Sequence, residues 1–182
     1  EHRHTRTAAS LFDTCHMSEF RVSGDRAAAA LDTVFARGTA DQKPGTCRYT
    51  FLLSAQGTIL DDLIVYRLED DEFFIVGNAG THDRDKSVIE ERVERGAQFE
   101  DISANTGKLD VQGPASPAVL AELGMDEARQ PGRFRCRRGR LAGCDVLVSG
   151  TGYTGELGYE IYVDVERAAA LWDRLCECET IQ

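Results

Sequence analysis

The stretch that decides the fold is Cys47–Ser54 (CRYTFLLS), followed by residues 55–57 (AQG) and then by Thr58–Leu68 (TILDDLIVYRL). Both long runs are rich in β-branched, aromatic and aliphatic residues, and only three residues separate them. Two such runs joined by a short loop that contains glycine predict a β-hairpin, with Gly57 in the left-handed position of the loop. Residues 69–71 then predict an acidic turn, and Glu72–Val76 a returning strand.

Outward from this hairpin, short strands alternate with single helices. Ser23, Gly24 and Asp25 are suited to cap an alanine-rich helix. Further strands are predicted near residues 20–22, 98–102, 108–112, 133–138, 141–149 and 159–163, and helices near 27–36, 83–95, 116–123 and 168–178, whereas no element clearly begins in Glu1–Met17. The order strand, helix, hairpin, strand, helix occurs twice. It predicts an α+β fold with a mainly antiparallel sheet and two related halves, about residues 1–102 and 103–182.

Composition narrows the possible partners. The formal net charge of −10 argues against binding along a nucleic-acid backbone, because such affinity comes mainly from lysine and arginine. No apolar run approaches the roughly 20 residues that span a bilayer, so no membrane is expected. The six cysteines form no CxxC pair, which argues against a metal site and predicts reduced thiols, in the cytoplasm of a bacterium or in a mitochondrial matrix.

The aspartates at the start of the second hairpin strand are the first candidates for chemistry. Asp61 and Asp62 precede a wholly apolar run, although acidic residues are depleted in strands because burial of a charge is costly. Neighbours along a strand point to opposite faces, so at most one of the two reaches a given site. A turn-capping role and a functional carboxylate both remain open.

Two further segments have unusual composition. Residues 150–160 (GTGYTGELGYE) place four glycines around two tyrosines, which suits close approach to a flat ligand but also a long connection between strands. Arg133, Arg135 and Arg137 alternate with other residues, and Arg138 and Arg140 follow. This stripe, Arg133–Arg140, predicts either a surface for a polyanion or an acidic partner, or a solvated strand face.

Taken together, these segments resemble the glycine-cleavage T-protein (aminomethyltransferase) family. The matching strings occur in family order over the whole chain: TRT (5–7), LFD (11–13), HM (16–17), GTILDDLIVY (57–66), NA (78–79), QGP (112–114), TGYTGE (151–156) and GYE (158–160). The resemblance implies a duplicated α+β fold related to the ferredoxin-like topology, with folate held centrally between the halves. It also implies transfer of a one-carbon unit from the aminomethyl-lipoyl arm of the H-protein to tetrahydrofolate, with release of ammonia and without a metal or redox cofactor.

Carried over position by position, the resemblance makes Asp62 the catalytic aspartate. It assigns folate contacts to Met17, Tyr49, Asn78, Tyr153 and Glu160. A carboxylate such as Glu160 suits the pterin edge, because it accepts hydrogen bonds from a ring N–H and an adjacent amino group together.

Two departures from the family pattern stand out, one in the segments that the chain contains and one at a position near the pocket. The family's upstream segment with Gly-Trp and Met-Pro is absent, and so are its downstream Gly-Leu-Gly-Ala-Arg-Asp segment and C-terminal β-barrel domain. A position near the pocket that often carries an aromatic residue falls close to Arg133. The alternatives are a folate-dependent demethylase of another one-carbon donor and a non-catalytic folate-binding module of the iron–sulfur assembly type. Such modules generally lack the Asp-Asp-Leu string, so its presence favours transfer.

One geometric expectation concerns the hairpin. If Ser54 faces Thr58, regular pairing sets Asp62 opposite Thr50 and leaves Tyr49 on the other face. A one-residue bulge would bring Tyr49 to the face of Asp62, and bulges occur next to active sites. We predict that Tyr49 and Asp62 share one face.

Overall fold

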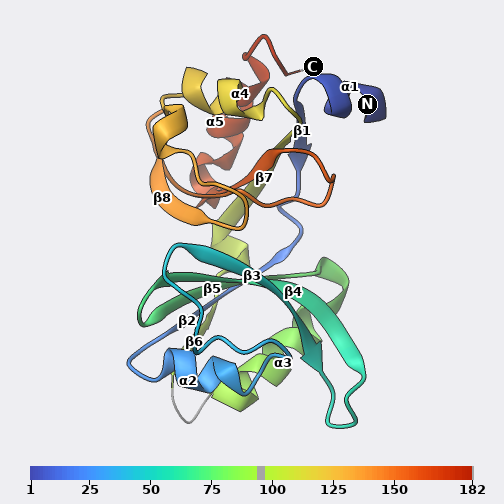
Figure 1. Cartoon of the computed structure of the whole chain (residues 1–182), viewed down its shortest axis with the longest axis vertical. Coiled ribbons are helices and arrows are strands. Elements are labelled where there is room, and N and C mark those ends of the chain that lie inside the picture. Colours follow the sequence, from blue (N-terminus) through green and yellow to red (C-terminus); the bar gives the residue numbers. More distant parts are fainter. Residues whose placement is uncertain (94–96, 182) are drawn as a thin grey trace. The chain divides into compact units, whose positions relative to one another are not determined.

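The computed structural model describes residues 1–93 and 97–181 and divides into two compact units (Figure 1). Unit 2 is His16–Ala104. Unit 1 combines Glu1–Cys15 with the chain from Asn105 onward.

Unit 2 is one antiparallel sheet with two helices. Its elements are β2 (Ser18–Ser23), α2 (Ala27–Asp32), β3 (Thr46–Leu53), β4 (Ile59–Glu69), β5 (Glu72–Gly77), a 3-10 turn η1 (Ala79–Thr81), α3 (His82–Val93) and β6 (Gln98–Asp101), followed by η2 (Ser103–Asn105) at the boundary between the units. The strand order is β3-β4-β5-β2-β6. Without β3, the remaining order β4-β5-β2-β6 is that of a βαββαβ ferredoxin-like unit.

The core of unit 2 lies where α2 and α3 cover one face of this sheet (Figure 1). Alternation along each strand sends every second residue to that face. On β2, Phe20 and Val22 are fully buried while Arg21 between them is exposed. The helices contribute Leu31, Ile89 and Val93 to the same cluster.

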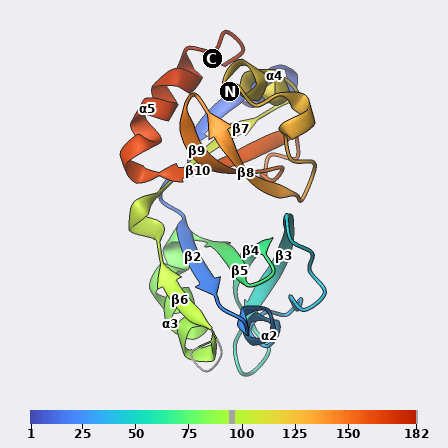
Figure 2. The same ribbon diagram turned by 90° about the vertical axis from the view of Figure 1, so that its left-hand side faces the viewer.

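Unit 1 repeats this arrangement. Its elements are α1 (His2–Thr7), β1 (Ser10–Asp13), β7 (Thr106–Gln112), α4 (Ser116–Glu122), η3 (Glu127–Arg129), β8 (Cys136–Leu141), β9 (Cys144–Ser149), β10 (Gly158–Asp164) and α5 (Val165–Cys176). The strand order β1-β7-β10-β9-β8 matches that of unit 2, with β1 in the place of β6. Figure 2 shows α5 beside this sheet, where Leu171 and Leu175 join its core. The predicted α+β class with duplicated antiparallel sheets is confirmed.

The expected division of the chain at about residue 102 misplaced its first residues. Residues 1–15 were expected in the first half, but they belong to unit 1 because β1 pairs with β7, with Ser10 opposite Gln112 and Asp13 opposite Leu109. The same pairing explains why no element was predicted there. A four-residue strand that forms only against a distant partner leaves no local signal.

Some predicted elements have different bounds in the structure. The first helix ends at Asp32 because Phe35 bridges to Leu52 of β3, and its N-cap is Arg26 rather than Ser23, Gly24 or Asp25. The helix expected to reach Arg95 is described only to Val93, and Arg95 lies outside the described residues.

The strand expected over residues 133–138 begins only at Cys136. Before it, the amide of Arg135 bonds to the carbonyl of Gly132 at 3.0 Å, and Phe134 has a φ of 53°, so the backbone turns here. In the described part of the chain, no helix is long and apolar enough to cross a membrane.

Candidate functional site

A bulge in the β3–β4 hairpin brings two candidate residues together. The turn forms as predicted, with Gly57 at φ +79° and the Ser54 amide 2.9 Å from the Thr58 carbonyl. Leu53 pairs with Ile59 whereas Leu52 pairs with Asp61, so one extra residue stands on β4. The Tyr49 hydroxyl therefore donates to Oδ2 of Asp62 at 3.1 Å, and the predicted shared face is confirmed.

The two aspartates have different surroundings. Asp61 is buried, and its Oδ2 accepts from the Asn78 amide at 3.1 Å and from the Thr81 hydroxyl at 2.9 Å. The Asn78 side chain donates to Oδ1 of Asp61 at 2.9 Å and also lies 3.4 Å from Oδ1 of Asp62. Asp62 itself is exposed. Asp61 thus fixes the loop after β5, while Asp62 presents its carboxylate to solvent.

The charges of this acidic cluster shift the nearby groups. Burial alone would raise the pKa of Asp61, but the neighbouring Asp85 carboxyl group and hydrogen bonds from Asn78 and Thr81 lower it below its usual value. Burial and the hydrogen bond to Asp62 raise the pKa of Tyr49. The cluster therefore keeps Asp61 ionised and the Tyr49 hydroxyl protonated.

Met17 lies next to the same loop. It is half-buried and directly precedes β2, where Ser18 pairs with Gly77. The Ser18 hydroxyl also donates to the Asn78 carbonyl at 3.3 Å. Met17 and Asn78 therefore stand just beyond the ends of neighbouring strands.

Glu160 of unit 1 belongs to a buried ionic cluster. It stands opposite Asp110 on the pair β10–β7, and Nζ of Lys108 lies 2.8 Å from Oε1 of Glu160 and 2.6 Å from Oδ1 of Asp110. The other oxygen of Glu160 accepts from the hydroxyls of Thr151 and Tyr162. One ammonium thus compensates two carboxylates.

Burial opposes both kinds of charge in this cluster. It would lower the pKa of Lys108, but Glu160 and Asp110 raise it above its usual value. Burial raises the pKa of Asp110 to about 6 because the effect of Lys108 does not fully offset it. Thr14 completes the cluster, accepting from Lys108 at 3.1 Å and donating to Asp110 at 3.0 Å.

The glycine-rich segment wraps around Gln112, the first residue of the QGP string. A β-carbon at Gly152 or Gly158 would stand only 2.3 or 2.2 Å from the amide end of the Gln112 side chain, so glycine at both positions leaves room for this side chain in its observed place. The Gln112 amide group donates to the Thr151 carbonyl at 3.2 Å and accepts from the Thr154 hydroxyl at 3.1 Å. The segment is therefore an ordered loop that packs on Gln112 and is hydrogen-bonded to it.

This loop borders a hollow of about 230 Å³ on unit 1. Its lining consists of Arg133, Phe134, Gly150, Thr151, Gly152, Gly155, Glu156, Leu157 and Gly158. Tyr153 projects from the loop and is 85% exposed. The family often has an aromatic residue at a position close to Arg133. Here the exposed Phe134 is next to Arg133, and its ring centre lies 5.8 Å from the Arg133 guanidinium.

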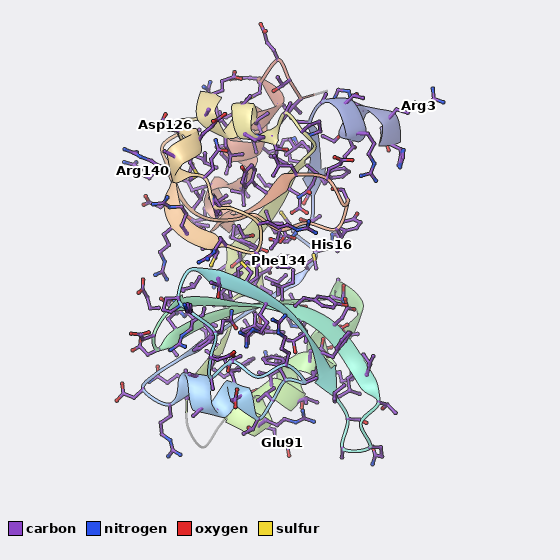
Figure 3. All side chains as sticks on the ribbon, viewed as in Figure 1. Arg3, His16, Glu91, Asp126, Phe134 and Arg140 are labelled. Carbon is purple, nitrogen blue, oxygen red and sulfur yellow. The ribbon has the colours of Figure 1, made fainter. Side chains whose placement is uncertain are left out.

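The stripe Arg133–Arg140 is not one face of a strand. Arg133 and Arg135 precede β8, and Arg137 and Arg138 are neighbours on it, so they point to opposite faces. The arginines at 133, 135, 137, 138 and 140 are all exposed. Figure 3 shows Arg140 projecting outward, and its guanidinium lies 3.4 Å from Asp145.

Several residues of these clusters were missed in the sequence, although signals existed. Asp85 stands four residues before Ile89 and eight before Val93, which puts an acid on the buried face of α3. On β7, Lys108, Asp110 and Gln112 alternate with apolar residues and form a polar face. The helix and the strand were predicted from their apolar residues alone, and the polar residues between them were not used.

The six cysteines are free thiols. Over residues 1–93 and 97–181, no group of three or more His, Cys, Asp or Glu side chains is arranged to hold a metal ion.

Comparison with known proteins assigns the chain to a family. The family described as GCVT N-terminal domain matches residues 1–180. The chain belongs to this family. An aminomethyltransferase of Streptomyces coelicolor is 40% identical over 179 residues, which cover 96% of the chain and 47% of that protein. One of Saccharopolyspora erythraea is 38% identical over 178 residues, which cover 97% of the chain and 48% of that protein.

Solved structures agree with this assignment. The glycine cleavage system aminomethyltransferase T of Bartonella henselae superimposes with a TM-score of 0.91 at 33% identity, covering 100% of the chain and 49% of that protein. A heterotetrameric sarcosine oxidase of Corynebacterium sp. U-96 has a TM-score of 0.67 at 20% identity, covering 94% of the chain and 85% of that one, and shares the fold alone. The GCVT N-terminal domain chain spans about half the length of the curated relatives it matches.

Proposed function

We propose that this protein is an aminomethyltransferase of the glycine cleavage system. Its substrates are an aminomethyl group carried on the lipoyl arm of the H-protein and tetrahydrofolate, and its products are 5,10-methylenetetrahydrofolate, ammonia and the reduced lipoyl arm. The names of its relatives support this reaction. The proposed compartment is the cytoplasm of a bacterium or a mitochondrial matrix.

The observation that carries the proposal is the exposed carboxylate of Asp62. Its Oδ2 accepts a hydrogen bond from Tyr49 at 3.1 Å, and the side-chain nitrogen Nδ2 of Asn78 lies 3.4 Å from its Oδ1. A carboxylate held in this way keeps a fixed direction while remaining open to a ligand. Such preorganisation is what electrostatic stabilisation of a transition state requires.

The chemistry proposed for Asp62 follows from the reaction. When the carbon–sulfur bond breaks, its electron pair stays on sulfur, and the departing aminomethyl carbon acquires positive charge as N5 of tetrahydrofolate attacks it. A negative carboxylate stabilises that developing charge more than it stabilises the ground state, which lowers the barrier. Asp62 is therefore the proposed catalytic residue.

The proposed folate contacts are five side chains, each described within its own unit. In unit 2 they are Met17, Tyr49 and Asn78, which lie around Asp62 and the loop after β5. In unit 1 they are Tyr153 and Glu160. Glu160 already contacts Lys108 at 2.8 Å and accepts from the hydroxyls of Thr151 and Tyr162. These bonds fix the direction of its carboxylate, which supports its role as an anchor for the pterin edge.

The test compares Asp62→Asn with Asp71→Asn in the intact protein. Asp71 is an exposed acid in the turn at the other end of β4, so it controls for the loss of one negative charge. Asp62→Asn should lower the single-turnover rate of methylenetetrahydrofolate formation by about 10²–10⁴-fold, with folate affinity changed much less. Asp71→Asn should leave the rate unchanged.

Two other outcomes would count against the proposal. Near-normal turnover by Asp62→Asn would remove Asp62 from the catalytic role. Tight folate binding by the unmodified protein without any product from aminomethyl-loaded carrier would favour a folate-binding module or a demethylase of another donor, and methylated glycines would then be assayed as substrates.

A further inference from the structure

Asp85 is a buried acid behind the candidate site of unit 2. It lies on the inner face of α3 with none of its surface exposed. Its Oδ1 is 3.5 Å from Nε of Arg84, a long contact, and its Oδ2 has no hydrogen-bond partner among the described residues. A buried carboxylate oxygen left in this state is costly, so the group needs a proton or a partner.

The nearest candidate partner is Asp61. A β-carbon placed at Gly77 would stand 3.6 Å from Oδ2 of Asp61 and 3.6 Å from Oδ2 of Asp85, so both oxygens face the same point above β5. Gly77 has no β-carbon, so this space stays free. A β-carbon at this position would also stand 3.3 Å from the Leu63 side chain. Two carboxylates in such a position cannot both carry charge at little cost.

The donors around Asp61 decide which of the two acids holds the proton. Asp61 already accepts from the Asn78 amide, the Asn78 side chain and the Thr81 hydroxyl, and these bonds favour its charged form. Asp85 has the long Arg84 contact and the neighbouring Thr81 hydroxyl, which lies 2.9 Å from Asp61. The proton therefore resides on Asp85, whose hydroxyl can donate to Asp61.

We propose that Asp85 is a positioning residue: its protonated carboxyl group donates a hydrogen bond to Asp61 and so holds Asn78 and Thr81 beside Asp62. Asp61 then has a donor on every side, and the loop after β5 is fixed. Asp85 touches neither substrate nor Asp62. The consequence for catalysis rests on the proposed function, whereas the shared proton does not.

Among residues 1–93 and 97–181, the charged groups around the pair face solvent or have other partners. Asp62 on β4 faces solvent, and Arg84 makes the long contact already described. The groups on the elements packed against α3 have other partners: His82 and Lys86 contact Asp101 of β6 at 3.2 and 3.0 Å, Arg21 bonds to Glu100, Asp32 of α2 accepts from Thr39 and Ala40, and Arg92 donates to Val34 and Leu53.

The direction of the pKa shift agrees with this assignment. Burial raises the pKa of Asp85 to about 6, and the hydrogen bond with Asp61 adds to the rise. The folded-state pKa lies above the usual 3.8. The neutral acid therefore contributes its full stability below pH 3.8, and this contribution is lost as pH rises through about 6.

The first test is carbon NMR of the aspartate carboxyl groups in the unmodified protein. We expect the Asp85 signal to titrate with a midpoint of about 6, and the Asp61 signal to respond at the same pH as its donor is lost. An Asp85 carboxyl group that is fully ionised at pH 5 would overturn the proposal. This measurement needs neither a substrate nor a variant.

The second test compares Asp85→Asn with Asp85→Leu. The asparagine amide donates to Asp61 at every pH, whereas leucine fills a similar volume without a donor. In the wild type, the apparent KM for tetrahydrofolate should rise as pH passes about 6, and in Asp85→Asn this dependence should vanish. Asp85→Leu should raise KM about tenfold at all pH values, with kcat changed much less.

The outcomes separate this proposal from the proposed function. Equal effects of Asp85→Asn and Asp85→Leu would mean that a donor at this position is irrelevant, and they would overturn the positioning role. If the protein transfers no aminomethyl group at all, the NMR midpoint still decides whether the proton is shared. A normal transferase whose Asp85 is ionised at pH 5 would fail this proposal alone.

Discussion

The two units share one strand order but use opposite solutions for their buried charges. In unit 1, Lys108 compensates Asp110 and Glu160 at 2.6 and 2.8 Å. In unit 2, Asp61 and Asp85 face the same point, with neutral donors from Asn78 and Thr81 on Asp61 and the Arg84 guanidinium 3.5 Å from Asp85, and Asp62 stands exposed beside them. An ammonium group compensates the charges of the first cluster, whereas a proton on Asp85 lowers the charge of the second.

One scaffold can thus hold two kinds of site. The duplicated sheet sets the positions of the side chains, since β2-β5 and β7-β10 are equivalent central pairs. Which charges occupy those positions then decides the chemistry. A lysine-compensated cluster mainly orders its own carboxylates, while a proton-sharing pair leaves a neighbouring carboxylate free to act and makes its order depend on pH.

The largest effect is expected when the cation of unit 1 is removed. Lys108→Met keeps much of the side-chain volume but leaves Asp110 and Glu160 buried without compensation. Breaking a buried ion pair from one side costs about 3–5 kcal/mol, and urea unfolding at pH 7 should show a loss of this size. The loss should shrink at pH 5, because the two carboxyl groups can then take up protons.

Lys86→Met is the matched control in unit 2. Lys86 contacts Asp101 at 3.0 Å, but its side chain is 42% exposed, so solvent already screens the pair. Lys86→Met should leave the unfolding transition nearly unchanged. If both lysine variants have the same small effect, the cluster of unit 1 is not the compensated buried site that its distances indicate.

A smaller effect is expected for the ligand-binding role of Glu160. Glu160→Gln and Asp110→Asn each remove one charged partner of Lys108, but only Glu160 is a proposed folate contact. Glu160→Gln should weaken tetrahydrofolate binding by about 10- to 150-fold, the equivalent of about 1.5–3 kcal/mol for a hydrogen bond to a charged group. Asp110→Asn should weaken it far less, as measured by calorimetric titration of the intact protein.

Equal weakening by both variants would show that Glu160 acts through the ionic cluster. Its apparent contribution would then come from the order of Lys108 and Thr151 rather than from contact with the pterin. Unchanged affinity in both would remove Glu160 from the folate site.

Local sequence patterns predicted most of the sheet but not the contacts between distant segments. The hairpin, its Gly57 turn and the face shared by Tyr49 and Asp62 follow from β-propensity, loop length and one bulge. Strand β1 could not be predicted, because its four residues become a strand only by pairing with β7, about 100 residues away.

The candidate site shows the same limit. Asp61 and Asp62 stand out because acids begin an apolar strand. Asp61 accepts from Asn78 and Thr81 and so has the capping role, whereas the catalytic role of the exposed Asp62 stays a prediction. The partner of Asp61 is on a helix, and the partner of Glu160 is on another strand. Such pairings depend on packing and register, which single-segment patterns do not contain. The turn before Cys136 was missed for a related reason, since Phe134 at positive φ is a conformation that its residue type does not suggest.

The smallest effect is expected at the outer strands, where the two units also differ. β3 of unit 2 has one arginine, Arg48, which Asp41 holds at 2.6 Å, whereas β8 and the segment before it present the exposed stripe Arg133–Arg140. We expect this stripe to attract an acidic carrier surface. Exposed charges are screened over about 8 Å at physiological ionic strength, so the Arg135→Gln, Arg137→Gln double variant should weaken carrier binding a few-fold at low salt and hardly at all at high salt. Arg21→Gln, which removes an exposed arginine of unit 2 that pairs with Glu100, should leave carrier binding unchanged at either salt concentration. If the double variant instead weakens binding of polyglutamylated folate and not of the carrier, the stripe serves the glutamate tail. Identical affinities in both salts for both ligands would make it a solvated surface, and the two outer strands would then differ in composition without differing in function.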